Sequence, residues 1–199
     1  GTANAGISGG TLNIIGNFNI TRGIWRSHAS IATTLIVNGT THITGTLTQA
    51  GTGSNQLTAI FNGPVNVYSG GTLGQSTNYK VDINNDLTVY TSGTFSAPNV
   101  NGTCNISSPF VKMYGTFTSN NGNVTFDKIG DFTYINNTWT GLHNIEVARN
   151  AGVWLTPSVA LSATDADSLT MQYGTTTLQA NASSVASYGN RNFFLKGGS

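Results

Sequence analysis

The chain has 199 residues and a formal net charge of +1, and only 8% of its residues are charged, against about 25% in an ordinary globular domain. Its eight Lys and Arg residues are scattered singly, which argues against nucleic acid as a partner. No apolar run reaches the length of a membrane span, so we expect no membrane-spanning segment. The length suits a single domain over residues 1–199.

A glycine-centred tripeptide recurs along the chain. Its copies are Gly23-Ile24-Trp25, Gly45-Thr46-Leu47, Gly71-Thr72-Leu73, Gly93-Thr94-Phe95, Gly115-Thr116-Phe117, Gly152-Val153-Trp154 and Gly174-Thr175-Thr176. Successive copies are separated by 22, 26, 22, 22, 37 and 22 residues. A short alternating segment precedes each copy, and polar dipeptides such as Asn38-Gly39 precede the earlier segments. A fixed period in the low twenties, with β alternation inside it, is typical of a solenoid built from stacked units.

We therefore predict an all-β chain forming a single parallel β-helix, or β-solenoid. The expected rung has about 22 residues, and the chain should hold seven to eight rungs with open, uncapped ends. An antiparallel sandwich is the alternative, because Asn-Gly between strands is also a hairpin signal. A sandwich, however, gives no reason for a fixed 22-residue register.

Stacking places equivalent residues in ladders at about 4.8 Å per rung. One inward ladder is expected to contain Ile20, Ile43, Val67, Val89, Met113, Val147 and Met171. A second is expected to contain Trp25, Leu47, Leu73, Phe95, Phe117 and Trp154. Between them, Asn19, His42, Asn66, Thr88, Lys112, Glu146 and Thr170 should face outward. The alignment thus predicts Lys112 beside Glu146, and Trp154 in the same stack as Phe117.

Two intervals exceed the period. One adds four residues near 52–55, and the other adds about fifteen within 120–141. Extra residues in a solenoid are extruded as loops, often on the binding face. The second interval contains Phe132, Tyr134 and Trp139, which makes it a candidate binding loop for glycans. The alternative is a flap that packs these aromatic residues onto the solenoid wall.

Catalytic chemistry finds little support in the sequence. The pair Asp165 and Asp167 is the best local candidate for acid–base or calcium chemistry, but both residues fall where a turn is expected. Cys104 is the only cysteine and is expected to be a buried core thiol. We therefore predict no enzyme activity, no catalytic residue, no metal site and no cofactor.

The repeated strand, Asn-Gly corner, strand and Gly-Thr-apolar segment resembles the right-handed parallel β-helix repeats of secreted microbial surface proteins, including filamentous-haemagglutinin-like adhesins. The resemblance covers nearly the whole chain and implies an extracellular or cell-surface location with a structural or adhesive role. It carries over no catalytic residue. Acceptor sequences for N-glycosylation, compatible with a surface glycoprotein, occur at Asn19, Asn38, Asn101, Asn105, Asn123, Asn136 and Asn181.

The ends of the chain suggest self-assembly. Gly1 lies 22 residues before Gly23, whereas the segment from Phe193 to Gly197 begins a rung without finishing it. We expect a structural subunit of an extracellular filament that assembles head to tail. Its polymer interface is expected to contain Gly1, Thr2, Ala3, Phe193, Leu195 and Gly197. The alternatives are an adhesin or carbohydrate-binding module, and an ice-binding protein that uses an outward Thr array.

Overall fold

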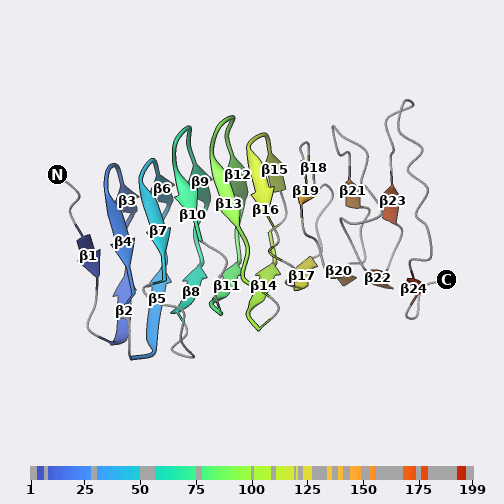
Figure 1. Ribbon diagram of the computed structural model, residues 1–199, viewed down its shortest axis with the longest axis horizontal. Coiled ribbons are helices and arrows are strands. Elements are labelled where there is room, and N and C mark those ends of the chain that lie inside the picture. The colour runs from blue at the N-terminus through green and yellow to red at the C-terminus, as the bar shows by residue number, and fades with distance from the viewer. Residues whose placement is uncertain are drawn as a thin grey trace.

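The computed structural model describes the backbone of residues 4–6, 9–27, 31–49, 57–74, 78–99, 101–108, 111–118, 120, 123–126, 134–135, 139–140, 144–148, 153–155, 168–173, 176–178 and 192–195. The described side chains are those of residues 9–120 within these ranges, together with Val124 and Thr125. All regular structure in these ranges is β-strand, arranged in parallel sheets along one axis (Figure 1). The predicted all-β parallel solenoid is confirmed, while the number and length of its rungs stay predictions.

The strands form three sheets, which we call A, B and C. Sheet A has seven strands: β1 (Asn4–Gly6), β4 (Ile24–Arg26), β7 (Thr46–Thr48), β10 (Thr72–Leu73), β13 (Thr94–Ser96), β16 (Thr116–Thr118) and β19 (Trp139–Thr140). Sheet B has nine: β2 (Gly10–Ile14), β5 (Thr33–Val37), β8 (Leu57–Phe61), β11 (Lys80–Ile83), β14 (Thr103–Ile106), β17 (Asn123–Phe126), β20 (Asn144–Ala148), β22 (Ser168–Tyr173) and β24 (Asn192–Leu195). Sheet C has eight: β3 (Phe18–Ile20), β6 (Thr41–Ile43), β9 (Val65–Val67), β12 (Leu87–Val89), β15 (Val111–Met113), β18 (Tyr134–Ile135), β21 (Val153–Leu155) and β23 (Thr176–Leu178).

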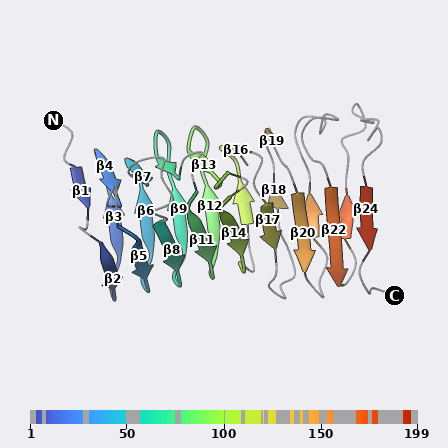
Figure 2. The same ribbon diagram turned by 60° about the horizontal axis from the view of Figure 1, so that its bottom comes forward.

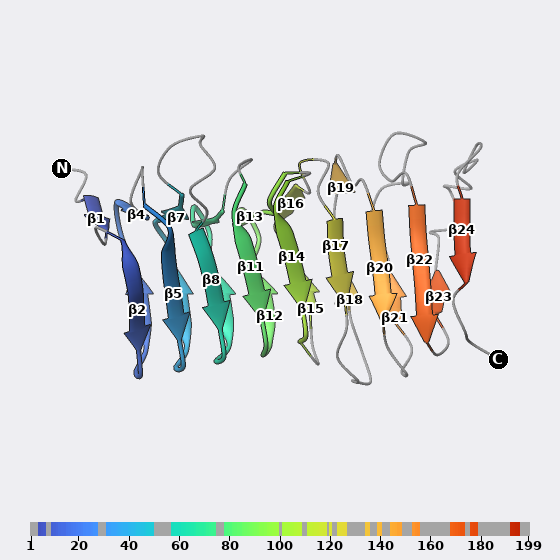
Figure 3. The same ribbon diagram turned by 90° about the horizontal axis from the view of Figure 1, so that it is seen from below.

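The chain visits sheets A, B and C in turn over its first half, so that each strand pairs with strands one coil away. Figure 2 shows the strands following in chain order from β1 at one end to β24 at the other. Figure 3 shows the strands of sheet B side by side and pointing the same way. Every pairing between the described strands is parallel, as stacking of successive coils requires.

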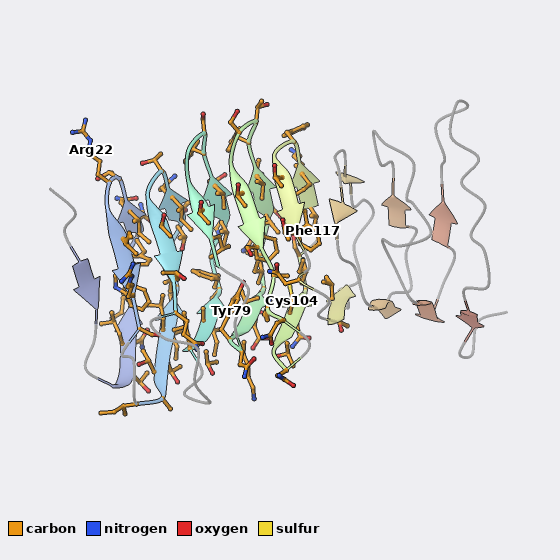
Figure 4. The ribbon with its side chains drawn as sticks, in the orientation of Figure 1. Arg22, Tyr79, Cys104 and Phe117 are labelled. Carbon is orange, nitrogen blue, oxygen red and sulfur yellow. The ribbon has the colours of Figure 1, made fainter. Side chains whose placement is uncertain are left out.

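Alternation of side chains builds the core. In β5, Thr33, Leu35 and Val37 are buried while Thr34 and Ile36 are half-buried, because successive side chains on a strand point to opposite faces. The inward residues of the three sheets form one apolar cluster. In Figure 4, Phe117 and Cys104 lie among the side chains enclosed by the sheets, whereas Arg22 projects away from the turn between β3 and β4.

The recurring glycines are needed because consecutive coils approach closely. A Cβ added at Gly71 would lie 2.2 Å from the carbonyl oxygen of Ile43, and one at Gly115 would lie 2.3 Å from that of Gly93. Neither Gly71 nor Gly115 has a positive φ, although Gly23 does, at 79°. At Gly71 and Gly115 the glycine therefore makes room for backbone packing between coils rather than serving a left-handed turn.

The interval 120–141 is a further coil rather than an extruded loop. It contains β17, β18 and β19, one strand for each sheet. Trp139 lies opposite Phe117 in sheet A, although the sequence before Trp139 reads Asn137-Thr138 with no glycine. The expected alignment of the coils was wrong because it used the glycine of the repeated tripeptide as its marker. In this part of the sequence no glycine stands two residues before Trp139. The shorter expected insertion, near 52–55, lies outside the described residues.

Later positions in the expected ladders are therefore corrected. Trp154 lies opposite Tyr134 and Thr177 in sheet C, not in the stack of Phe117. Val147 and Met171 belong to sheet B rather than to the ladder of Met113.

The expected pairing of Lys112 with Glu146 is also wrong. Lys112 lies opposite Thr88 and Tyr134 in sheet C. Glu146 lies opposite Thr125 and Thr170 in sheet B. The two residues therefore belong to different sheets, since the alignment skipped one coil.

The first strand is shifted as well. Spacing alone places Gly1 beside Gly23 and hence Ala3 beside Trp25, whereas the structure places Ala5 opposite Trp25. The interval between the first two strands of sheet A is thus two residues shorter than the period assumed. Backbone hydrogen bonds between parallel strands form equally well in several registers, so a 22-residue spacing alone does not specify this one.

The Thr41 hydroxyl is buried in the solenoid. Thr41 is fully buried between Phe18 and Val65, and its Oγ1 has no hydrogen-bond partner. Replacing Thr41 with Val, which has the same shape, is expected to raise the free energy of unfolding by about 1 to 3 kcal/mol, because the hydroxyl no longer has to be desolvated. Urea titration of both proteins measures this difference.

Thr33 offers the matched control for that substitution. It is equally buried, but its Oγ1 donates a hydrogen bond to the carbonyl oxygen of Ile31 at 3.2 Å. Thr33→Val is expected to lower the free energy of unfolding by about 0.5 to 1.5 kcal/mol. Equal effects of the two substitutions would contradict this account of Thr41.

Candidate functional site

Three tyrosines occupy equivalent positions directly after strands of sheet C. Tyr68, Tyr90 and Tyr114 follow β9, β12 and β15. Their backbone N–H groups donate to carbonyl oxygens one coil back, each at 2.8 Å. The parallel ladder therefore extends one residue beyond each strand, and it brings the tyrosines into a row along the outside of the solenoid.

His42, Tyr68 and Tyr90 form a continuous aromatic stack. The rings of Tyr68 and Tyr90 are nearly parallel, with centroids 4.8 Å apart and 6° between their planes. The His42 ring stacks on Tyr68 with a centroid distance of 5.8 Å and 16° between the ring planes, and its Nδ1 lies 3.0 Å from the Tyr68 hydroxyl oxygen. Desolvation, with a smaller contribution from Tyr90, raises the pKa of Tyr68 above its usual value. The expectation that His42 lies on the outer side of its strand is confirmed.

The stack leaves part of its aromatic surface open. Tyr90 is 39% exposed and Tyr114 is 43% exposed, while His42 and Tyr68 are half-buried. The tyrosine spacings of 22 and 24 residues are visible in the sequence. The alternation of apolar residues gives no sign of the tyrosine row, because the three tyrosines fall just outside the alternating strands.

A ladder of asparagines runs along the corner between sheets B and C. Asn38 donates its side-chain N–H to Oδ1 of Asn13 at 2.9 Å, Asn62 donates to Asn38 at 2.7 Å, and Asn84 donates to Asn62 at 2.9 Å. Asn38 and Asn62 each both donate and accept. Asn38, Asn62 and Asn84 directly follow equivalent strands of sheet B, whereas Asn13 lies on β2 itself. The polar corner residues therefore stabilise the stacking itself.

The threonine face expected on sheet A is only partly regular. Thr46, Thr72, Thr94 and Thr116 lie in register along the sheet. In the neighbouring column, Thr48 is buried and lies opposite Arg26. Ice binding by this face stays a prediction.

The candidate binding loop has a different setting from the one expected. Tyr134 and Trp139 lie on strands β18 and β19, opposite Lys112 and Phe117, so they belong to the wall of the solenoid. Phe132 lies outside the described residues. Glycan binding by these residues stays a prediction.

The acceptor asparagines for glycosylation differ in their surroundings. Asn19 and Asn101 are exposed, whereas Asn105 is half-buried and donates to Oδ1 of Asp82 at 2.8 Å. Asn38 is exposed, with its amide in the asparagine ladder. Asn123 lies on β17, and Asn136 and Asn181 lie outside the described residues.

The expected polymer interface is described only at its C-terminal part. Phe193 and Leu195 lie on β24, opposite Leu169 and Met171 of β22, as their common alternation predicted. Strand β24 is the last of sheet B, and β2 is the first. Gly1, Thr2, Ala3 and Gly197 lie outside the described residues.

Two ionisable groups are fully buried in the core. The Tyr79 hydroxyl donates a hydrogen bond to the carbonyl oxygen of Ser96, and desolvation raises its pKa well above the usual value. Cys104 is a buried free thiol, as predicted, and desolvation followed by the charge of Asp82 raises its pKa. Both side chains fill space between the sheets and stay protonated there.

In the described part of the chain, no group of three or more His, Cys, Asp or Glu side chains is placed to hold a metal ion. The same residues contain no helix that could span a bilayer.

The fold and its outer rows of side chains define the class of protein as a parallel β-solenoid. Comparisons with protein-family models, with curated proteins and with solved structures found no match to the chain. Its function is therefore argued from its own residues.

Proposed function

We propose that the chain is a structural segment of an extracellular filament or surface fibre, in which solenoids stack end to end by continuing their sheets. The observation that carries the proposal is the apolar end of the stack at strand β2. Leu12 and Ile14 of β2 are only partly buried, whereas Leu35 and Val37, their neighbours on β5, are fully buried. The two columns of inward-facing apolar residues in sheet B thus reach the end of the described stack, and no described polar segment covers them there.

Strand edges at the two ends of sheet B are complementary. Among the described strands, β2 pairs with β5 and β24 pairs with β22, so these two strands form the edges of the described sheet B. At such an edge a strand can present one row of backbone groups to a parallel neighbour. Phe193 and Leu195 hold the positions in β24 that Leu12 and Ile14 hold in β2, two residues apart in both strands. A second copy placing β2 beside β24 continues both apolar columns.

A contact of this kind joins two different surfaces and so propagates without closing. Its stability comes from apolar burial and a backbone ladder, with few charges to be screened by salt. The low charged fraction of the chain, 8%, suits such a joint. This joint pairs β24 with β2. The sequence alone had instead predicted residues 1–3 at the N-terminal side of the interface.

End-blocked variants test the joint. We expect the 199-residue protein to form polymers in sedimentation and electron microscopy. Leu12→Asp with Ile14→Asp blocks one end, and Phe193→Asp with Leu195→Asp blocks the other, because each places charges in an apolar contact. Each variant alone is expected to be monomeric, and a mixture of the two is expected to form dimers through the one intact joint.

The matched control is Asn13→Asp, which adds charge to the exposed side of β2 and keeps an oxygen that accepts from Asn38. It is expected to polymerise normally. Monomeric wild-type protein at all concentrations, or normal polymers from the Leu12 and Ile14 variant, would rule out this function.

A carbohydrate-binding or adhesin module is the second candidate. The observation that favours it is the row of exposed amides at Asn38 and Asn62, which repeats hydrogen-bonding groups at the interval of one coil. An extended glycan presents hydroxyl groups in a comparable row. Monomeric protein that binds defined glycans on an array would favour this candidate over the filament.

A further inference from the structure

Tyr68 and Tyr90 are held as a ring pair across two coils. Their centroids are 4.8 Å apart and their planes differ by 6°. Their backbone positions are fixed by the ladder, since Tyr68 donates to Ile43 and Tyr90 donates to Val67. Two reacting groups held in contact behave as an intramolecular pair, with a large advantage over groups that meet by diffusion.

The pair is open to solvent at one side. Tyr90 is 39% exposed and Tyr68 is half-buried, whereas Tyr79 is 1% exposed within the core. A small oxidant, or a radical formed by an enzyme in solution, therefore has access to the pair but not to Tyr79.

His42 provides a proton acceptor for one member of the pair. Its Nδ1 lies 3.0 Å from the Tyr68 hydroxyl oxygen. Neutral imidazole with its proton on Nε2 accepts a hydrogen bond through Nδ1. Loss of an electron from a phenol makes its hydroxyl strongly acidic, and a positioned base takes up the released proton. Tyr68 is thus the tyrosine of the stack that is best placed to be oxidised.

We propose that Tyr68 and Tyr90 form an oxidative cross-linking site, at which hydrogen peroxide and a haem peroxidase join the two rings and bind successive coils covalently. Each phenol gives up one electron and one proton, so that the peroxide O–O bond is cleaved and two water molecules form. The two phenoxyl radicals couple through one new C–C bond between carbons adjacent to the hydroxyl-bearing carbons. The hydrogens on these two carbons return to the oxygens, and the protein has lost two hydrogen atoms in total.

The test treats the folded 199-residue protein with a haem peroxidase and dilute hydrogen peroxide. We expect dityrosine fluorescence and, after proteolysis, a cross-linked peptide pair that contains Tyr68 and Tyr90 and lacks two hydrogens. The yield within one molecule is expected to be independent of protein concentration. The cross-linked protein is also expected to unfold at a higher urea concentration, because the bond restrains the unfolded chain.

Phenylalanine variants separate chemistry from packing, since they keep the ring and remove the hydroxyl. Tyr68→Phe and Tyr90→Phe are each expected to abolish this product, while Tyr114→Phe serves as the matched control and is expected to retain it. His42→Phe keeps an aromatic ring beside Tyr68 but removes the acceptor, so the product is expected to form several-fold more slowly.

Three results would overturn the proposal. The first is equal yield of the intramolecular product from Tyr90→Phe. The second is a wild-type product that joins separate molecules rather than Tyr68 to Tyr90. The third is equal selectivity for this pair in protein unfolded with urea, which would show that the stack plays no part.

Discussion

Replacing Phe95 with alanine is expected to lower the free energy of unfolding by about 3 to 5 kcal/mol, the usual cost of removing a buried phenyl ring. Phe95 is fully buried in sheet A, opposite Leu73 and Phe117, and its ring centroid lies 5.3 Å from that of Phe117. Backbone pairing on both sides holds the strands in place, so the neighbours cannot collapse into the space. Urea or thermal unfolding measures the loss.

Thr94→Ala is the control for that substitution, because Thr94 is the preceding residue of the same strand and lies on the half-buried outer face. Its effect is expected to stay within about 0.5 kcal/mol. A loss below about 1 kcal/mol for Phe95→Ala would show that the ring does not contribute to a packed core.

Gly71→Ala is expected to cost about 3 kcal/mol or more, at or above the upper end for overpacked interiors. The added Cβ would lie 2.2 Å from the Ile43 carbonyl oxygen and 3.0 Å from that of Tyr68. Both atoms belong to backbone, which cannot rotate away as a side chain does. Relief requires two coils to separate, and that weakens the pairing of the strands on either side.

Gly16→Ala is the matched substitution without a clash. A Cβ at Gly16 meets nothing within 4 Å, and no positive φ is recorded there. Alanine is expected to be neutral at this position, or to stabilise the protein by up to about 1 kcal/mol by restricting the unfolded chain. Equal losses at Gly16 and Gly71 in denaturant titrations would contradict close coil packing as the reason for the repeated glycine.

Close packing of the coils also produces the features on which the proposed cross-link, glycan binding and filament joint depend. In-register coils align Tyr68 with Tyr90 and Asn38 with Asn62, so that one side chain per coil becomes a row on the surface. The same register carries apolar columns to the end strands, where Leu12 and Ile14 are incompletely covered. The surface rows of side chains and the incompletely covered apolar end strand thus both follow from the repetition of equivalent coils.

The fold class, and the register of the coils between Ile20 and Phe117, can be read from the amino-acid sequence. The ladder Ile20, Ile43, Val67, Val89 and Met113 was predicted and is confirmed by pairing in sheet C. Alternation is readable because apolar side chains occupy most of the inward positions, where burial removes them from water. Burial of Cys104 followed from the same alternation.

The register beyond Phe117 and the grouping of the aromatic stack depend on how the coils pack, which the sequence does not show. Gly152-Val153-Trp154 resembles the repeat in sequence, yet β21 lies in sheet C and Trp139 takes the place beside Phe117. A glycine is required only where the backbones of successive coils approach too closely to leave room for a Cβ atom. The separation of the two backbones depends on the path of both coils. Likewise, Tyr68 meets His42 and Tyr90 because parallel pairing brings residues 22 to 26 positions apart into contact.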